Sequence, residues 1–290
     1  MKKFFPPLIG FITLLCGIQV FAQGQVSNLS IQVPDGYNLL FEDNFNQPGK
    51  PSTNDWLFRN NKKAGGLSLP ANAIINNGCL QIKYTHNASS KPGEQFRGGG
   101  VVSTHNFGYG YYESRIKFYG GSPDQSGFHQ SFWSMGLTGT NEAEGAGVRD
   151  SLVNIDAIPQ ENRVLEIDAI ELESKHNSLD QNYHVYSPVH KMEYPENGKI
   201  TKDLSKWVVM GYEWLPDRVN FYCDGKYFAT KKLEGIWKLF VPQNVWFTAL
   251  PVEWAGGMSI PKEGAMMQVD YFRFYAKKLP GANRIGNEGF

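Results

Sequence analysis

The segment Arg163-Val-Leu-Glu-Ile-Asp-Ala-Ile-Glu-Leu-Glu-Ser174 combines the apolar residues of a β-strand with four acidic side chains. In a regular strand, residues two positions apart lie on the same face. Glu166 and Asp168 would then face one way and Glu171 the other, and neither face would be cleanly polar or apolar. A one-residue β-bulge at Ala169-Ile170 removes this conflict, because the extra residue shifts the alternation. The segment therefore predicts a bulged strand with three acids on one face.

Three neighbouring acids indicate chemistry, because like charges destabilise a strand unless protons or cations are shared. An exposed, solvated acidic strand is the structural alternative. A metal site is another: the segment has no His or Cys, but calcium could bind through oxygen ligands alone. Glycoside hydrolysis uses such a cluster, since one carboxylate attacks the sugar and a carboxylic acid protonates the leaving oxygen. An acid between the two, here Asp168, would keep their pKa values apart.

The surrounding sequence predicts an all-β fold, because short strand-like runs recur between Gly, Pro, Asn and Asp residues. Examples are residues 79–84, 111–118, 207–214, 218–223 and 267–275. Asp224-Gly225 is a two-residue hairpin signal, and sustained helical periodicity is nearly absent. These features favour a sandwich of two antiparallel sheets.

Two polar, Gly-containing stretches, residues 120–127 and 138–158, are expected to be surface loops. Loops on a sandwich commonly border its binding face, and tolerated insertions are the alternative.

The charges of the chain balance, with 28 Lys and Arg against 28 Asp and Glu. A balanced surface exerts no long-range attraction on nucleic acid or acidic membrane. Neutral or weakly charged partners are therefore expected, and nucleic acid is not.

The first 22 residues have the layout of a cleaved secretory signal, with a positive start at Met1-Lys2-Lys3 and an apolar run that ends at Val20-Phe21-Ala22. Pro6-Pro7 and the polar flanks argue against a membrane anchor. Leu15 stands before Cys16 where a lipid-attachment signal has a small residue, which argues against a lipoprotein. A secreted or periplasmic protein without a membrane span is therefore expected.

The remaining chain predicts one domain over residues 36–277, with a polar lead-in at 23–35 and a tail at 278–290. Its length suffices for a single large core, and we expect a monomer. Cys79 and Cys223 either pair or remain as two buried thiols, and the sequence leaves both options open.

Six segments together resemble glycoside hydrolase family 16, the laminarinase, agarase, carrageenase and lichenase group. Glu-Ile-Asp-Ala-Ile-Glu, residues 166–171, matches the bulged Glu-x-Asp-x-x-Glu motif of that family. The others follow in family order, at residues 40–45, 109–117, 130–135, 212–225 and 269–275.

This resemblance implies a concanavalin A-like β-jelly-roll with a substrate cleft on its concave face. It implies a secreted retaining endo-β-glycanase acting on β-1,3- or β-1,4-linked polysaccharide, either β-glucan or algal galactan. Glu166 would be the nucleophile and Glu171 the acid/base, with Asp168 assisting. Trp133 would line the cleft, and a core tryptophan is its alternative.

His190 falls where the family often has a cleft histidine, and a structural histidine is equally compatible. Trp254 is a further aromatic candidate for substrate binding, at the core or the rim. The resemblance requires no cofactor, but some relatives hold a structural calcium ion, to which Asp270 could contribute.

Some positions depart from the family pattern. Residues 99–103 lack the arginine common in laminarinases, Gln130-Ser131 replaces Pro-Ala, and the usual Asn near residues 248–250 is missing. These departures favour a galactan or an unusual glycan over plain β-1,3-glucan. A non-catalytic, lectin-like glycan-binding protein on the same fold and a transglycosylase are the competing interpretations.

Overall fold

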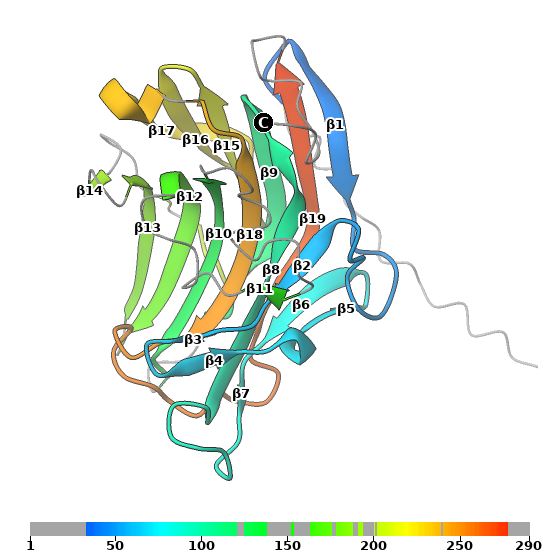
Figure 1. The fold of residues 1–290 in the computed structure, drawn as a ribbon, viewed down its shortest axis with the longest axis vertical. Helices are drawn as coiled ribbons and strands as arrows, with labels where there is room; N and C mark the ends of the chain where they lie inside the picture. Colours follow the sequence, from blue (N-terminus) through cyan, green and yellow to red (C-terminus); the bar gives the residue numbers. More distant parts are fainter. Residues whose placement is uncertain are drawn as a thin grey trace, which may run out of the picture. The chain divides into compact units, whose positions relative to one another are not determined.

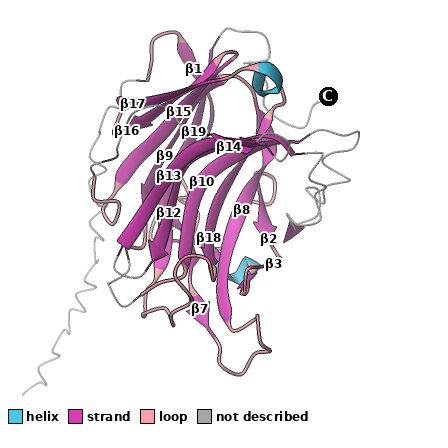
Figure 2. Cartoon of the chain, turned by 90° about the vertical axis from the view of Figure 1, so that its left-hand side faces the viewer, coloured by secondary structure: helices cyan, strands magenta, loops and turns pink. Residues whose placement is uncertain are grey.

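Two β-sheets make up nearly all of the computed structural model, which describes residues 33–120, 125–137, 152–153, 163–175, 178–187, 191–193, 200, 202–238 and 240–277. The expected signal, most of the lead-in and the tail lie outside these ranges. Figure 2 shows how little of the described chain is helical: two short 3-10 turns, η1 (Pro70–Asn72) and η4 (Gly235–Lys238). None of the helices in these ranges has the length and apolar character needed to cross a membrane.

The first sheet has eight strands in the order β17-β16-β15-β9-β19-β6-β5, with β1 also paired to β19. All its pairings are antiparallel. Its strands are β1 (Tyr37–Asp43), β5 (Ala73–Asn76), β6 (Cys79–Lys83), β9 (Gly110–Lys117), β15 (Val208–Leu215), β16 (Arg218–Cys223), β17 (Lys226–Lys232) and β19 (Met266–Lys277).

The second sheet has eleven strands, and its main path runs β11-β2-β8-β18-β10-β12-β13-β14. Short strands β3, β4 and β7 attach through β8. Its strands are β2 (Trp56–Arg59), β3 (Lys62–Lys63), β4 (Gly66–Ser68), β7 (Thr85–His86), β8 (Phe96–Phe107), β10 (Phe128–Leu137), β11 (Leu152–Val153), β12 (Arg163–Lys175), β13 (Ser178–Ser187), β14 (Lys191–Glu193) and β18 (Gln243–Pro251).

The two sheets form the predicted β-jelly-roll sandwich (Figure 1). Aromatic rings from both sheets fill the space between them. Phe132 stacks on Phe247 within the second sheet, with ring centroids 5.1 Å apart, and Tyr112 stacks on Tyr212 within the first at 4.4 Å. The Tyr212 hydroxyl donates a hydrogen bond across the core to Ser134 Oγ at 2.7 Å. The side of the second sheet that faces away from this core is called the outer face below.

The predicted hairpin is confirmed: Asp224 and Gly225 join β16 to β17 with φ values of 48° and 71°. Two successive positive φ angles suit the right-handed twist of the flanking strands. Cys79 and Cys223 are both buried and free. They lie on β6 and β16, which are separated by β15, β9 and β19, so these thiols do not pair.

The prediction of a loop over residues 138–158 is wrong in one respect, because Leu152–Val153 form strand β11. This strand pairs in parallel with β2, whose free edge it covers. The rest of that stretch lies outside the described residues.

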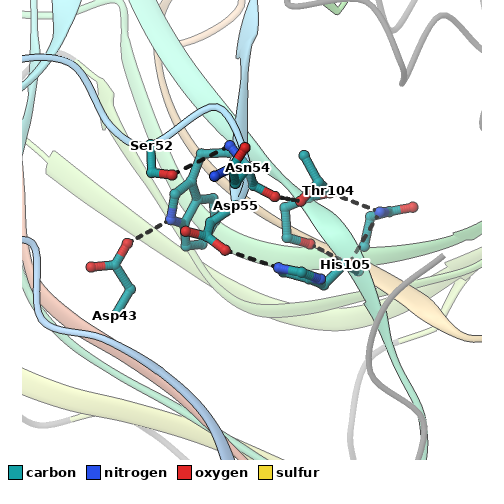
Figure 3. A network of polar contacts seen from close by, with 9 residues as sticks. Asp43, Ser52, Asn54, Asp55, Thr104 and His105 are labelled. Carbon is teal, nitrogen blue, oxygen red and sulfur yellow. Dashed lines mark hydrogen bonds and ion pairs between the residues drawn. The ribbon is translucent and has the colours of Figure 1, made fainter.

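A polar network links the segment before β2 to β8 (Figure 3). Asp43 Oδ2 accepts a hydrogen bond from the Trp56 indole at 2.7 Å, and His105 Nε2 lies 2.9 Å from Asp55 Oδ1. The Thr104 hydroxyl donates to a backbone carbonyl of the same segment. None of the acids of β12 takes part in these contacts.

Candidate active site

The predicted β-bulge lies in β12. From Asp168 to Glu171 the strand advances three residues, whereas its partner β13 advances only from His184 to Asn182. The pairing with β10 is irregular at the same place. One extra residue is therefore inserted at Ala169-Ile170, as the conflict in the sequence predicts.

The bulge sorts the side chains of β12 between the two faces. Ile167, Ile170 and Leu172 belong to the hydrophobic core between the sheets. Asp168 and Glu171 lie on the outer face, where each places a carboxylate oxygen within 4.8 Å of a His184 nitrogen and of the other. Glu166 stands two residues before Asp168 in the regular part of β12, so the alternation of a strand assigns it to the same face. The concave cleft stays a prediction, because residues 121–124, 138–150 and 188–190 are not described.

Two histidines from the neighbouring strands hold Glu171 between them. His129 Nε2 on β10 lies 3.3 Å from Glu171 Oε1, and His184 Nδ1 on β13 lies 3.7 Å from Oε2. The other nitrogen of each ring faces a further acid: His184 Nε2 is 3.0 Å from Asp168 Oδ2, and His129 Nδ1 is 3.7 Å from Glu173 Oε1. Acids and imidazoles thus alternate in a row, Glu173-His129-Glu171-His184-Asp168, called the carboxylate–histidine row below.

Burial sets different protonation states along this row. Burial raises the pKa of Asp168 well above its usual range, and burial followed by the charge of Asp168 raises the pKa of Glu171 to about 7. The His129 imidazole, assisted by the Lys175 ammonium, lowers the pKa of Glu173 to about 2. Burial lowers the pKa of His184. Near neutral pH the row therefore avoids the full repulsion of three adjacent carboxylates.

The described residues contain one group whose donor atoms lie close enough together to hold a cation, formed by Asp168, Glu171 and His184. Burial favours protonated Asp168 and Glu171, and both His184 nitrogens face carboxylates. We therefore interpret the group as proton-sharing. Asp270 accepts a hydrogen bond from Arg115 at 2.8 Å, and its proposed part in a calcium site stays a prediction.

Trp133 lies beside the acids on the outer face, where it pairs across the strands with Asp168. Its ring stacks on Trp246 with centroids 4.8 Å apart, and its Nε1 donates to Thr248 Oγ1 at 3.1 Å. It is only 6% exposed but is not part of the core cluster between the sheets. Its buried ring leaves the core alternative open, and substrate contact stays a prediction.

An arginine reaches the same face from β2. Arg59 Nη1 donates to Thr248 Oγ1 at 3.1 Å, and its guanidinium lies 5.8 Å from the Trp246 ring centroid. A Cβ on Gly100 would lie 2.8 Å from Arg59 Cδ, so the glycine makes room for this side chain. A guanidinium is therefore present on this face although residues 99–103 contain no arginine.

Trp254 lies at the rim of the outer face and is 45% exposed. Its ring meets His129 at 6.1 Å and 68°, and Lys63 Nζ lies 5.4 Å from its centroid. The ring is therefore exposed and not part of the core, and its contact with substrate stays a prediction. His190 lies outside the described residues.

Comparison with known proteins identifies the fold. No family model matches the sequence, and no curated protein matches it. Solved structures do match, including SCLam, a non-specific endo-β-1,3(4)-glucanase from family GH16, with a TM-score of 0.65 at 20% identity over 85% of this chain and 93% of that one. The laminarinase from Rhodothermus marinus has a TM-score of 0.63 at 16% identity, over 82% of this chain and 97% of that one.

A third match is the β-porphyranase BpGH16B from the human gut bacterium Bacteroides plebeius, with a TM-score of 0.58 at 19% identity over 84% of this chain and 94% of that one. The chain has the fold of the family 16 glycoside hydrolases. At these identities the similarity establishes the fold alone, and the chemistry depends on the residues of the outer face.

Three of these residues, His129, His184 and Arg59, were not predicted from the sequence. His129 precedes Ser131 and Trp133 in steps of two, and this alternation could have placed it on the same face. The contact of His184 with Asp168 depends on the register between β12 and β13. Arg59 gave no signal in the sequence, because it reaches the site across β8.

Proposed function

We propose that the protein is a retaining endo-β-glycanase that cleaves β-1,3- or β-1,4-linked polysaccharide, either β-glucan or algal galactan. The observation that carries this proposal is the bulge in β12, which brings Glu166, Asp168 and Glu171 to one face. The structural likeness to an endo-β-1,3(4)-glucanase, a laminarinase and a β-porphyranase supports it.

In this mechanism Glu171 acts first as an acid. Its pKa of about 7 lets it keep a proton at neutral pH, and it gives this proton to the glycosidic oxygen as that bond breaks. The Glu166 carboxylate attacks the anomeric carbon and forms a covalent glycosyl-enzyme. Glu171, now ionised, takes a proton from the water that attacks the same carbon, and Glu166 leaves. Two displacements restore the original anomeric configuration.

Asp168 assists by reducing the charge between these two groups. It is 1% exposed, and burial favours its protonated form. A protonated Asp168 lowers the repulsion that its charge would exert on Glu171 as Glu171 ionises, and His184 Nε2 lies 3.0 Å from its Oδ2. Trp133 would supply an apolar surface against a sugar ring beside the cleaved bond.

The buried acids lower the folding stability, and catalysis explains why the protein has them better than glycan binding alone. Burying carboxyl groups and raising their pKa values consumes folding free energy. Perturbed pKa values of this kind cluster at sites of acid–base chemistry. A binding protein on the same fold has no need of them.

The proposal is tested with a panel of laminarin, mixed-linkage glucan, agarose, porphyran and carrageenan. Release of reducing ends is measured for wild type, Glu166→Gln and a control, Glu234→Gln, which changes an exposed residue after β17. Turnover of at least one glycan by wild type and the control, with loss of turnover but retained binding in Glu166→Gln, supports the proposal. Full activity of Glu166→Gln contradicts the nucleophile assignment, and binding without turnover by wild type favours a glycan-binding protein.

Export is a further part of the proposal, supported by the signal-like residues 1–22. A protein expressed in a secreting host is expected to begin at Gln23. N-terminal sequencing of the exported product measures this, and a product that begins at Met1 contradicts it.

A further inference from the structure

His129 lies beside Glu171 on the side opposite to His184, and its Nε2 faces the carboxyl group of Glu171. We propose that His129, backed by Glu173, is a positioning residue that holds the Glu171 carboxyl group for proton transfer. This inference rests on the proposed function for its catalytic meaning, but the contact itself can be tested without a substrate.

The imidazole of His129 is fixed from several directions. Its side chain is 9% exposed, and Trp254 packs edge-on against it. Its backbone carbonyl accepts a hydrogen bond from the Tyr84 hydroxyl at 2.9 Å, which holds this part of β10. A ring fixed in this way can orient the carboxyl group that it touches, and Glu171 Oε1 lies 3.3 Å from its Nε2.

Glu173 prepares His129 for this role. Its Oε1 lies 3.7 Å from His129 Nδ1, and the Lys175 ammonium lies 3.2 Å from its other oxygen. Glu173, which itself contacts Lys175, thus lies on the far side of the ring while Nε2 faces Glu171 Oε1, so the ring is aligned between the two glutamates.

The same ring also affects the acidity of Glu171. A cationic or donating imidazole at this distance stabilises the carboxylate, and His129 accordingly lowers the pKa of Glu171 against the larger effect of burial. Other charged groups of the described residues face this part of the site from three elements: Glu166, Asp168 and Glu173 from β12, His184 from β13, and Lys63 from β3. They stay in place when only His129 is replaced.

The test compares wild type, His129→Gln, Glu173→Gln and the double variant. The side-chain carboxyl of Glu171 is titrated by NMR in protein labelled with ¹³C-glutamate, and its signal is assigned by its absence from Glu171→Gln. The control is His105→Gln, which breaks a histidine–carboxylate contact of 2.9 Å in a network without the acids of β12 (Figure 3). Thermal melting confirms that each variant is folded.

The wild-type midpoint is expected near 7. It is expected to rise by about 1 pH unit in His129→Gln, the usual effect of losing an opposite charge or donor at short range. Because Glu173 acts through His129, we expect a smaller rise of the Glu171 midpoint in Glu173→Gln. The double variant should have the same midpoint as His129→Gln. An unchanged midpoint in His129→Gln overturns the proposal, and so does a Glu173→Gln effect that persists without His129.

Activity provides a second readout on any glycan that wild type cleaves. His129→Gln is expected to lower kcat roughly tenfold or more while KM changes little, because an acid/base group is misplaced. The basic limb of its pH profile should move upward with the NMR midpoint. Equal kcat and an unmoved limb contradict the role. If wild type cleaves no glycan, the proposed function fails, and the NMR titration still decides whether His129 controls Glu171.

Discussion

Replacing Glu171 by glutamine is expected to make the folding stability of the protein less dependent on pH. Glutamine keeps the size of the side chain and can still contact the two histidines, but it cannot ionise. Glu171 in the folded protein has a pKa of about 7 in place of its ordinary value of 4.5, chiefly because it is buried. The unfolded chain therefore releases this proton at a lower pH than the folded protein does.

The magnitude follows from this difference of about 2.5 pH units, derived from 7 and 4.5. Each unit corresponds to about 1.4 kcal/mol, which gives about 3 kcal/mol of unfolding free energy. The folded-state pKa is raised, so this contribution is fully present below the unfolded value and is lost as pH rises through the folded value. Between about pH 4 and about pH 8, wild type should lose about 3 kcal/mol that Glu171→Gln keeps.

Urea unfolding followed by tryptophan fluorescence measures this, at pH steps across that range and with refolding checked at each step. The other titrating groups of the carboxylate–histidine row remain in both proteins, so the difference between the two curves reports Glu171. We expect the difference to grow with pH in favour of the variant. A difference constant to within about 0.5 kcal/mol, the usual size of a neutral surface change, would refute the burial argument.

Three further changes test other parts of the site and fold. Asp168→Asn mimics the neutral acid, so we expect little change in melting temperature at neutral pH and a kcat close to that of wild type; a kcat at least roughly tenfold lower would show that Asp168 needs an ionisable proton. Trp254→Ala is expected to raise KM about fivefold, equivalent to about 1 kcal/mol of aromatic contact, and an unchanged KM would remove Trp254 from the binding surface. Gly225→Ala, at a φ of 71°, is expected to lower the unfolding free energy by about 1 kcal/mol in urea titrations, and equal stability would mean that the hairpin tolerates a Cβ there.

The local features of the fold were predictable because they depend on residues close in sequence. The bulge follows from a conflict within β12 itself, and the β16–β17 hairpin follows from Asp224-Gly225. Both predictions are confirmed, because alternation and turn chemistry act over a few residues.

The partners of the acids were not predictable in the same way. His129 and His184 reach Glu171 only because β10 and β13 flank β12. The residue pattern within one strand does not reveal which strands lie next to it. Arg59 and Thr248 are separated by 189 residues in the chain, yet they share a hydrogen bond. The family resemblance predicted a cleft histidine at position 190, whereas the histidine beside Asp168 in the structure is His184.

The anomeric configuration of the first product tests the central claim most directly, since the roles of Glu166 and Glu171 require two displacements at one carbon. A glycan that the protein cleaves is followed by ¹H NMR from the first turnovers, before the new reducing end equilibrates in water. Retention predicts that the β-anomer appears first and the α-anomer only later. Initial release of the α-anomer would show a single displacement and contradict the assignment of Glu166 as nucleophile.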